Sequence, residues 1–193
     1  MALTSCGDRS AAAWLREPTT PWGTLVTFGP QVFPTYARVR FLPDPTAPGQ
    51  SESDVDVDAP DDLDVVRDVV TVLAAHTRTP DDVYFCLWDG WGTPPGLEGR
   101  PKVAVPNRLF FMFRGALADI GDWGTPRMEH AVVGHTPPPA FIWPADHAWC
   151  FAFDVDPHYA GIGGAAAAVA DLIGHPTLDA VEADPEKAQP LYR

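Results

Sequence analysis

Apolar and polar positions alternate along much of the chain and predict a series of strands. Residues 37–42 set Val39 and Phe41 against Arg38 and Arg40, which is the pattern of a half-buried strand. Short apolar runs bounded by glycine, proline or acidic residues predict further strands. They cover residues 24–28, 83–88, 102–105, 109–115 and 148–155, and a short edge strand is expected beyond Leu178.

A helical period appears in two other segments. Residues 61–76 repeat apolar side chains every three or four positions, at Leu63, Val66, Val70 and Leu73. The second helix is expected after a tight glycine turn at residues 159–164, and it should end before Gly174. Residues 10–17 favour a third, shorter helix.

This order of elements predicts an α+β fold, with a central antiparallel or mixed sheet and two or three helices packed mainly on one face. The 193 residues fit a single domain over 1–193, which can bury about 70% of the unfolded surface in one core. Three segments are distinguished within this domain. They are an N-terminal segment at 1–20, a mobile acidic proline-rich loop at 43–60 and a tail at 186–193.

Acidic residues dominate the charge of the chain. There are 26 acids against 13 bases, so the formal net charge is −13. Residues 51–68 hold eight acids and one arginine, which is over half of that excess. Such a surface repels nucleic acid and anionic membranes and favours a cationic protein partner, mainly by speeding its association.

The cysteines predict a reducing compartment. Cys6, Cys86 and Cys150 are odd in number and widely spaced, which fits neither a disulfide framework nor a zinc motif. The first residues lack an apolar stretch of signal-peptide length, and we expect a cytoplasmic protein. Pairing of Cys150 with His147, or of Cys86 with His76, would supply a nucleophile, but the apolar neighbours predict buried and inert thiols.

Known ligand motifs are not matched, so no cofactor is expected. The glycines of YAGIGG follow neither the dinucleotide nor the phosphate-loop spacing. Counted from Asp54, the acidic run has Ala59 and Val65 where a calcium loop needs glycine and glutamate. One metal hypothesis stays open. Asp154, Asp156 and His158 would point to the same side of an extended strand and offer two carboxylates and an imidazole.

Tryptophans near turns suggest a binding surface. Trp88 and Trp91 flank Asp89 in LWDGWG, and Trp143 lies in FIWPAD. Aromatic side chains at turns either cover the core or form the centre of an interface. The residues that we expect to bind a partner are these four together with the acids Asp54, Asp56, Asp58, Asp61 and Asp62.

Four phrases of the sequence resemble a family of uncharacterised actinobacterial proteins of about this length. They are FPTYARVRFLPDP, HTRTPDDVYFCLWDGWG, PNRLFFMFRGAL and FIWPADHAWCFAFDVDPHYAGIGG. The family shows a W-P-A-D-x-A-W-C phrase near its C-terminus. The resemblance runs from about Trp22 to the end, but it implies no activity. The turn AGIGGAAAA departs from the family's expected glycine pair followed by serine, which removes a polar side chain from this turn.

These observations favour a non-enzymatic cytosolic protein that binds a cationic partner, similar to an immunity or antitoxin-type inhibitor. A small hydrolytic or metal-dependent enzyme using Asp154, Asp156 and His158 is the alternative. A structural module that forms a homodimer is a further one.

Overall fold

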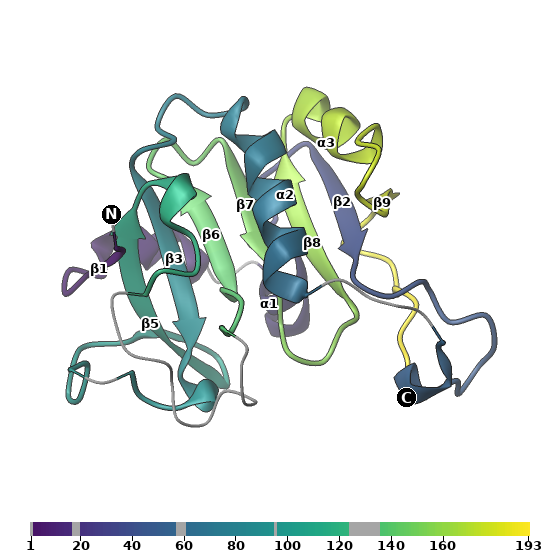
Figure 1. Cartoon of the computed structure of the whole chain (residues 1–193), viewed down its shortest axis with the longest axis horizontal. Coiled ribbons are helices and arrows are strands. Elements are labelled where there is room, and N and C mark those ends of the chain that lie inside the picture. The colour runs from purple at the N-terminus through teal and green to yellow at the C-terminus, as the bar shows by residue number, and fades with distance from the viewer. Residues whose placement is uncertain (1, 17–19, 57–60, 95, 124–135) are drawn as a thin grey trace.

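A single antiparallel sheet organises the computed structural model, which describes residues 2–16, 20–56, 61–94, 96–123 and 136–193. Eight of its nine strands follow the order β1-β5-β3-β6-β7-β8-β2-β9 (Figure 1), and the ninth, β4, pairs with β5. The strands are β1 (Thr4–Ser5), β2 (Thr35–Arg40), β3 (Val83–Trp88), β4 (Val103–Val105), β5 (Arg108–Gly115), β6 (Phe141–Pro144), β7 (Trp149–Ala152), β8 (Tyr159–Gly164) and β9 (Ala180–Ala183). The expected α+β class is confirmed.

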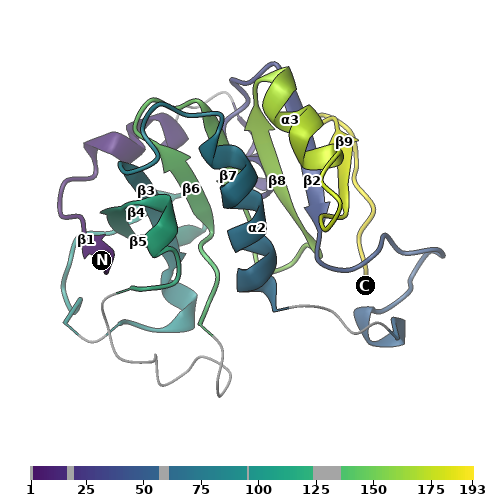
Figure 2. The ribbon, with the colours of Figure 1, turned by 45° about the horizontal axis from the view of Figure 1, so that its top comes forward.

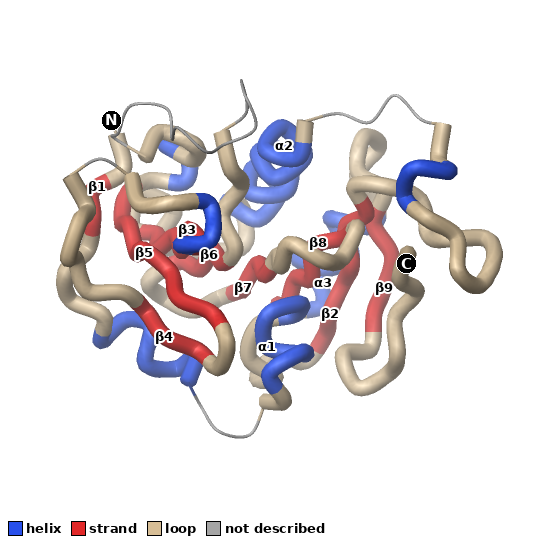
Figure 3. The backbone as a smooth tube through the Cα atoms, turned by 90° about the horizontal axis from the view of Figure 1, so that it is seen from below, coloured by secondary structure: helices blue, strands red, loops and turns tan. Residues whose placement is uncertain are grey.

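Helices cover both faces of the sheet. The α-helices are α1 (Trp22–Phe28), α2 (Asp62–Ala74) and α3 (Ala166–Ile173), and the short 3-10 helices are η1 (Ser10–Arg16), η2 (Glu52–Asp54), η3 (Asp89–Trp91) and η4 (Leu117–Asp119). Helices α2 and α3 pack side by side on one face (Figure 2). Helix α1 lies on the opposite face, against β7 and β8 (Figure 3).

Successive side chains of a strand point to opposite faces of the sheet, so each strand contributes to an apolar layer on both faces. In β3, Phe85 and Leu87 point into the larger core beneath α2 and α3, whereas Cys86 points into the layer on the other face. Both core residues and Cys86 are fully buried. A sheet covered on both faces can use continuous apolar strands, and the runs at β3, β5 and β7 have that composition.

Two expected elements are wrong. Residues 24–28, predicted as a strand, belong to helix α1, which begins after Pro21 and ends at Gly29 with a φ of 78°. Proline before and glycine after an element are helix boundary signals, and they outweigh the strand propensity of five residues. Residues 159–164, predicted as a glycine turn, form the fully buried strand β8.

The glycines of β8 have a packing reason. A Cβ at Gly161 would lie 2.1 Å from the carbonyl oxygen of Thr27 in α1, and one at Gly163 would lie 2.4 Å from the Phe33 ring. Glycine therefore lets a helix and a loop approach the strand backbone closely. The expected helix after this segment is confirmed as α3.

Candidate functional site

An arginine in contact with two tryptophan rings forms the centre of the candidate site. Arg108, at the start of β5, donates Nε and Nη2 to the two carboxylate oxygens of Asp154, each at 3.1 Å. The guanidinium carbon lies 5.2 Å from the centre of the Trp88 ring and 5.7 Å from that of Trp22. A bidentate carboxylate and two aromatic rings fix the guanidinium in place.

Trp88 also lines a small pocket beside this cluster. The cavity has a volume of about 120 Å³. Its lining is aromatic, aliphatic and acidic, formed by Asp62, Trp88, Trp91, Pro138, Ala140, Phe153, Asp154 and Val155. We call these residues, with Trp22 and Arg108, the tryptophan surface.

The local backbone holds the two pocket tryptophans. Trp88 ends β3 and Trp91 ends η3, so the short helix folds the chain back, and the rings meet edge to face at 5.7 Å between centres. A Cβ at Gly90 would lie 2.2 Å from the Trp88 indole, so glycine leaves the room that the ring occupies.

Carboxylates surround the pocket. Asp62 is in the first turn of α2, where the helix dipole favours an acid. Asp156, whose side chain is largely exposed, lies 3.6 Å from Arg108 Nη2. Asp89 is paired with Lys102 at 3.0 Å. Among the described lining residues there is no lysine, arginine or histidine, so the lining itself carries only negative formal charge.

The predicted binding residues are brought together only in part. Trp88, Trp91 and Asp62 line one pocket, and Asp89 lies on the helix between the two tryptophans. Trp143 was wrongly expected at an interface. Trp143 is fully buried, because all four residues of β6 are covered from both faces of the sheet. Its ring stacks on that of Tyr84, with 5.5 Å between the ring centres.

The acidic segment does not form one surface with the pocket. Asp54 accepts a hydrogen bond from the backbone N–H of Ser51 at the start of η2, beside the C-terminus (Figure 1). Asp56 is exposed near this helix, and Asp58 lies outside the described residues. Asp61 caps α2 by accepting from the Leu63 N–H at 2.9 Å. Of the described members of this group, only Asp62 lines the pocket.

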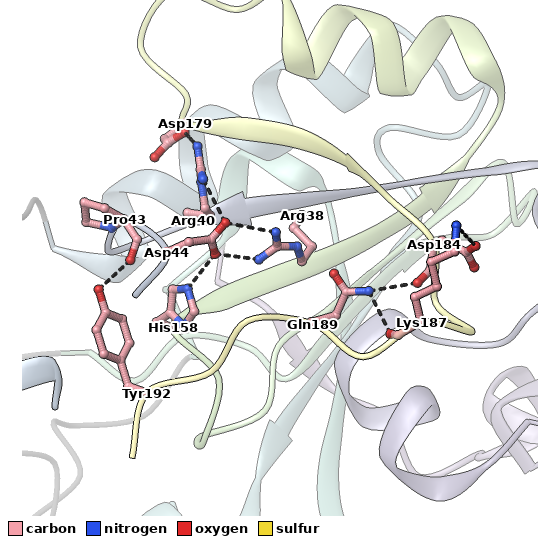
Figure 4. A network of polar contacts seen from close by, with 10 residues as sticks. All are labelled: Arg38, Arg40, Pro43, Asp44, His158, Asp179, Asp184, Lys187, Gln189 and Tyr192. Atoms are coloured by element: carbon pink, nitrogen blue, oxygen red, sulfur yellow. Dashed lines mark hydrogen bonds and ion pairs between the residues drawn. The ribbon is translucent and has the colours of Figure 1, made fainter. Parts of the chain in front are cut away.

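A second polar cluster surrounds Asp44 in the loop after β2 (Figure 4). Its carboxylate accepts two hydrogen bonds from Arg38, at 2.8 and 3.1 Å, and one from Arg40 at 2.9 Å. His158 Nε2 lies 3.0 Å from the same carboxylate, and Arg40 also pairs with Asp179. Partial burial raises the pKa of Asp44, but the hydrogen bonds from Arg38 and His158 and the arginine charge outweigh it, so that pKa lies well below its ordinary value.

The C-terminal tail closes this cluster. The Tyr192 hydroxyl donates to the Pro43 carbonyl at 2.6 Å, and its ring meets that of His158 at 4.8 Å between centres. The Arg193 N–H donates to the carbonyl of Gln50 at 3.0 Å. The described part of the loop that was predicted to be mobile, residues 43–56, is therefore anchored to the sheet through Asp44 and to the tail through Pro43 and Gln50.

The three residues of the metal hypothesis do not converge on one site. Asp154 pairs with Arg108, Asp156 is exposed, and His158 pairs with Asp44 with only 1% of its side chain exposed. The strand β7 ends at Ala152, so residues 154–158 lack the extended conformation that would align them. Among the residues that the structure describes, no group of three or more His, Cys, Asp or Glu side chains is placed to hold a metal ion.

The cysteines behave as buried apolar side chains. Burial raises the pKa of the Cys150 thiol far above its ordinary value, and burial likewise raises that of Cys86. His147 stacks on Trp14, with 4.3 Å between ring centres. The other predicted partner, His76, pairs with Asp171 of α3 at 2.8 Å. At neutral pH both buried thiols are protonated and are poor nucleophiles.

The sequence interpretation missed Trp22, Arg108 and Phe153. The side-chain pair of Arg108 and Asp154 joins positions that are 46 residues apart, which no local pattern indicates. One local signal was available for the arginine. It follows Asn107, whose φ of 60° marks the tight turn between β4 and β5, and so it begins a strand next to a surface turn.

The fold and the site define a class, an α+β protein with one antiparallel sheet and a tryptophan–arginine surface near one end of α2. Comparison with protein-family models, curated proteins and solved structures gives no match for the chain. No helix in the described ranges is both long enough and apolar enough to cross a membrane.

Proposed function

We propose that this protein is a non-enzymatic binding module for a cationic protein partner, of the immunity or antitoxin type of inhibitor. The observation that carries the proposal is the tryptophan surface. Trp22 is 38% exposed although it is a large aromatic side chain, and Val155 is 41% exposed beside the pocket. Tryptophan and arginine are the residue types that contribute most to binding at protein interfaces.

The arrangement is organised before any partner arrives. Arg108 is fixed by Asp154 and by the rings of Trp22 and Trp88. Binding to a fixed surface costs less side-chain entropy than binding to a mobile one. The net charge of −13 would add attraction at long range and speed association with a basic protein.

The test compares partner binding by the wild-type chain and by three variants. The wild-type protein is immobilised, its partner is captured from the source cells, and rates are measured with the purified partner. Trp22→Ala and Trp91→Ala are expected to speed dissociation by about ten-fold or more each. Ile173→Ala on α3, which removes an apolar side chain of 41% exposure elsewhere, should leave the rate unchanged.

Salt dependence tests the electrostatic part of the same proposal. Raising the salt concentration from about 50 mM to 500 mM should slow association by about ten-fold or more and change dissociation little. A partner whose binding all three variants retain, or whose association rate ignores salt, would overturn the proposal.

A further inference from the structure

We propose that a basic pocket between η1 and β4 binds the phosphate monoester of a small polyhydroxylated molecule. The cavity has a volume of about 290 Å³, close to the lower limit of about 300 Å³ for small-molecule sites. It shares no lining residue with the tryptophan surface, so this inference does not depend on the proposed function. The residues that line the basic pocket are Gly7, Asp8, Arg9, Ser10, Arg16, Lys102, Val103 and Ala104.

The pocket forms where the N-terminal segment leaves the edge of the sheet. Just after β1, the Cys6 N–H donates to the Met112 carbonyl of β5 at 2.7 Å. Strand β4 pairs with the same edge of β5, nearer to the start of that strand. Residues 7–9 therefore leave the sheet and lead into η1. Arg9 Nη1 donates to the Lys102 carbonyl at 3.1 Å, which holds this segment beside the beginning of β4.

Charge decides the sign of the ligand. The whole chain has two acids for every base, whereas the pocket lining has three bases and one acid. Asp89 pairs with Lys102 and offsets its charge. Arg9 donates to a carbonyl oxygen, and neither Arg9 nor Arg16 forms an ion pair with a carboxylate of the described residues. Two guanidinium groups are therefore available to an anion, and they outnumber the lining carboxylate of Asp8.

The arginines favour phosphate among the anions. A guanidinium group presents its N–H donors in a planar fork, which can bind two phosphate oxygens at once. A phosphate monoester carries about two negative charges at neutral pH, which matches two arginines. None of the eight described lining residues is aromatic, so the pocket offers no ring on which a nucleobase could stack.

Asp8 favours hydroxyl groups on the rest of the ligand. Its Oδ1 accepts from the Ser10 N–H at 2.9 Å, and its Oδ2 accepts from the Ser10 hydroxyl at 3.0 Å. These bonds lower the pKa of Asp8, so its carboxylate is ionised at neutral pH. An ionised carboxylate repels phosphate, but each of its oxygens has a further lone pair that can accept from a hydroxyl. The pocket thus combines a phosphate end with a hydroxyl end.

The first experiment titrates three small probes into the intact protein at constant ionic strength. They are glycerol 3-phosphate, inorganic phosphate and glycerol, and the backbone N–H signals of residues 7–10 and 102–104 are followed by NMR. Glycerol 3-phosphate is expected to shift these signals saturably, with a dissociation constant on the order of millimolar for a ligand of this size. Inorganic phosphate should bind at least about three-fold more weakly because it lacks the polyol. Glycerol should give no saturable shift because it lacks the charge.

Matched variants assign the effect to the pocket. Arg9→Gln and Arg16→Gln should each weaken the binding of glycerol 3-phosphate by about five- to twenty-fold. Arg78→Gln removes the same charge from a side chain that is 92% exposed and does not line the pocket, and it should leave binding unchanged. Asp8→Ala should remove the advantage of glycerol 3-phosphate over inorganic phosphate. All four residues are exposed, so the variants are expected to fold like the wild type.

Four results would overturn the basic pocket. They are the absence of a saturable shift with either phosphate, equal binding of glycerol, undiminished binding by both pocket arginine variants, and equal weakening by Arg78→Gln and Arg9→Gln. Equal affinities of the wild-type protein for the two phosphates would overturn the polyol as the chemical class of the ligand.

Discussion

At the scale of single residues, Gly161 shows how little space separates α1 from the sheet. A Cβ there would lie 2.1 Å from a backbone oxygen, Thr27 O, and 2.8 Å from the Cα of Phe28. Because the obstacle is main chain, it cannot rotate away. Gly161→Ala should therefore destabilise the protein by about 3 kcal/mol or more, measured by urea denaturation.

Gly23 provides the matched control on the same helix. Nothing lies within 4 Å of a Cβ built there, and the residue is inside α1. Gly23→Ala should be neutral or stabilise by up to about 1 kcal/mol, because alanine favours a helix. Equal effects of the two substitutions would show that α1 does not pack on β8 as described.

The Asp44 carboxylate makes the stability of the fold depend on pH. Its folded-state pKa lies below the ordinary 3.8, so the ionised carboxylate stabilises the fold fully above that value. The contribution is lost as the pH falls below 3.8 through the lower folded-state pKa. We expect Asp44→Asn to cost about 2–4 kcal/mol at neutral pH, since Arg38 loses the carboxylate it pairs with and Arg40 keeps only Asp179.

The same substitution should cost less in acid. The difference in stability between the two proteins should shrink from about pH 7 to pH 2.5, because Asp44 of the unfolded wild-type chain takes up a proton as the pH falls below 3.8. A difference that stays constant across this range would mean that the stabilisation comes from packing of the loop and not from the charge.

At the scale of elements, the spacing of apolar residues and the residues at element boundaries determine which helices and strands can be predicted from the sequence. The residues Leu63, Val66, Val70 and Leu73 repeat at helical spacing, and α2 is found where they predict it. The strands β3 and β5 follow from apolar runs in the same way. Segment 159–164 misled because glycine usually marks a turn, whereas here it clears space for a helix that lies more than a hundred positions earlier.

The candidate site was partly predictable for a related reason. Trp88, Trp91 and Asp89 are neighbours in sequence, so LWDGWG could indicate a surface turn by itself. Whether a tryptophan is covered depends on distant elements, and Trp143 is buried because both faces of β6 are covered. Trp22 joins the site only through the packing of Arg108, which the local sequence around position 22 does not encode.

At the scale of the whole molecule, the tryptophan surface and the cluster around Asp44 have different roles. The tryptophan surface presents apolar and acidic groups outward around a pocket. The cluster at Asp44 joins β2, the start of β8 and the loop after β2 from inside, with His158 and Asp44 separated by 114 positions. Contacts that anchor the C-terminal tail to this cluster stabilise the fold.

That tie predicts the effect of removing residues 190–193. The truncated chain loses the hydrogen bond from Tyr192 to Pro43, the ring contact with His158 and the bond from Arg193 to Gln50. We expect a loss of about 1–3 kcal/mol in stability and faster hydrogen exchange in residues 46–54, measured by mass spectrometry. Tyr192→Phe keeps the ring contact and should have a smaller effect. Unchanged exchange in the truncated chain would show that Asp44 alone holds the loop, because its bonds to Arg38 do not involve the tail.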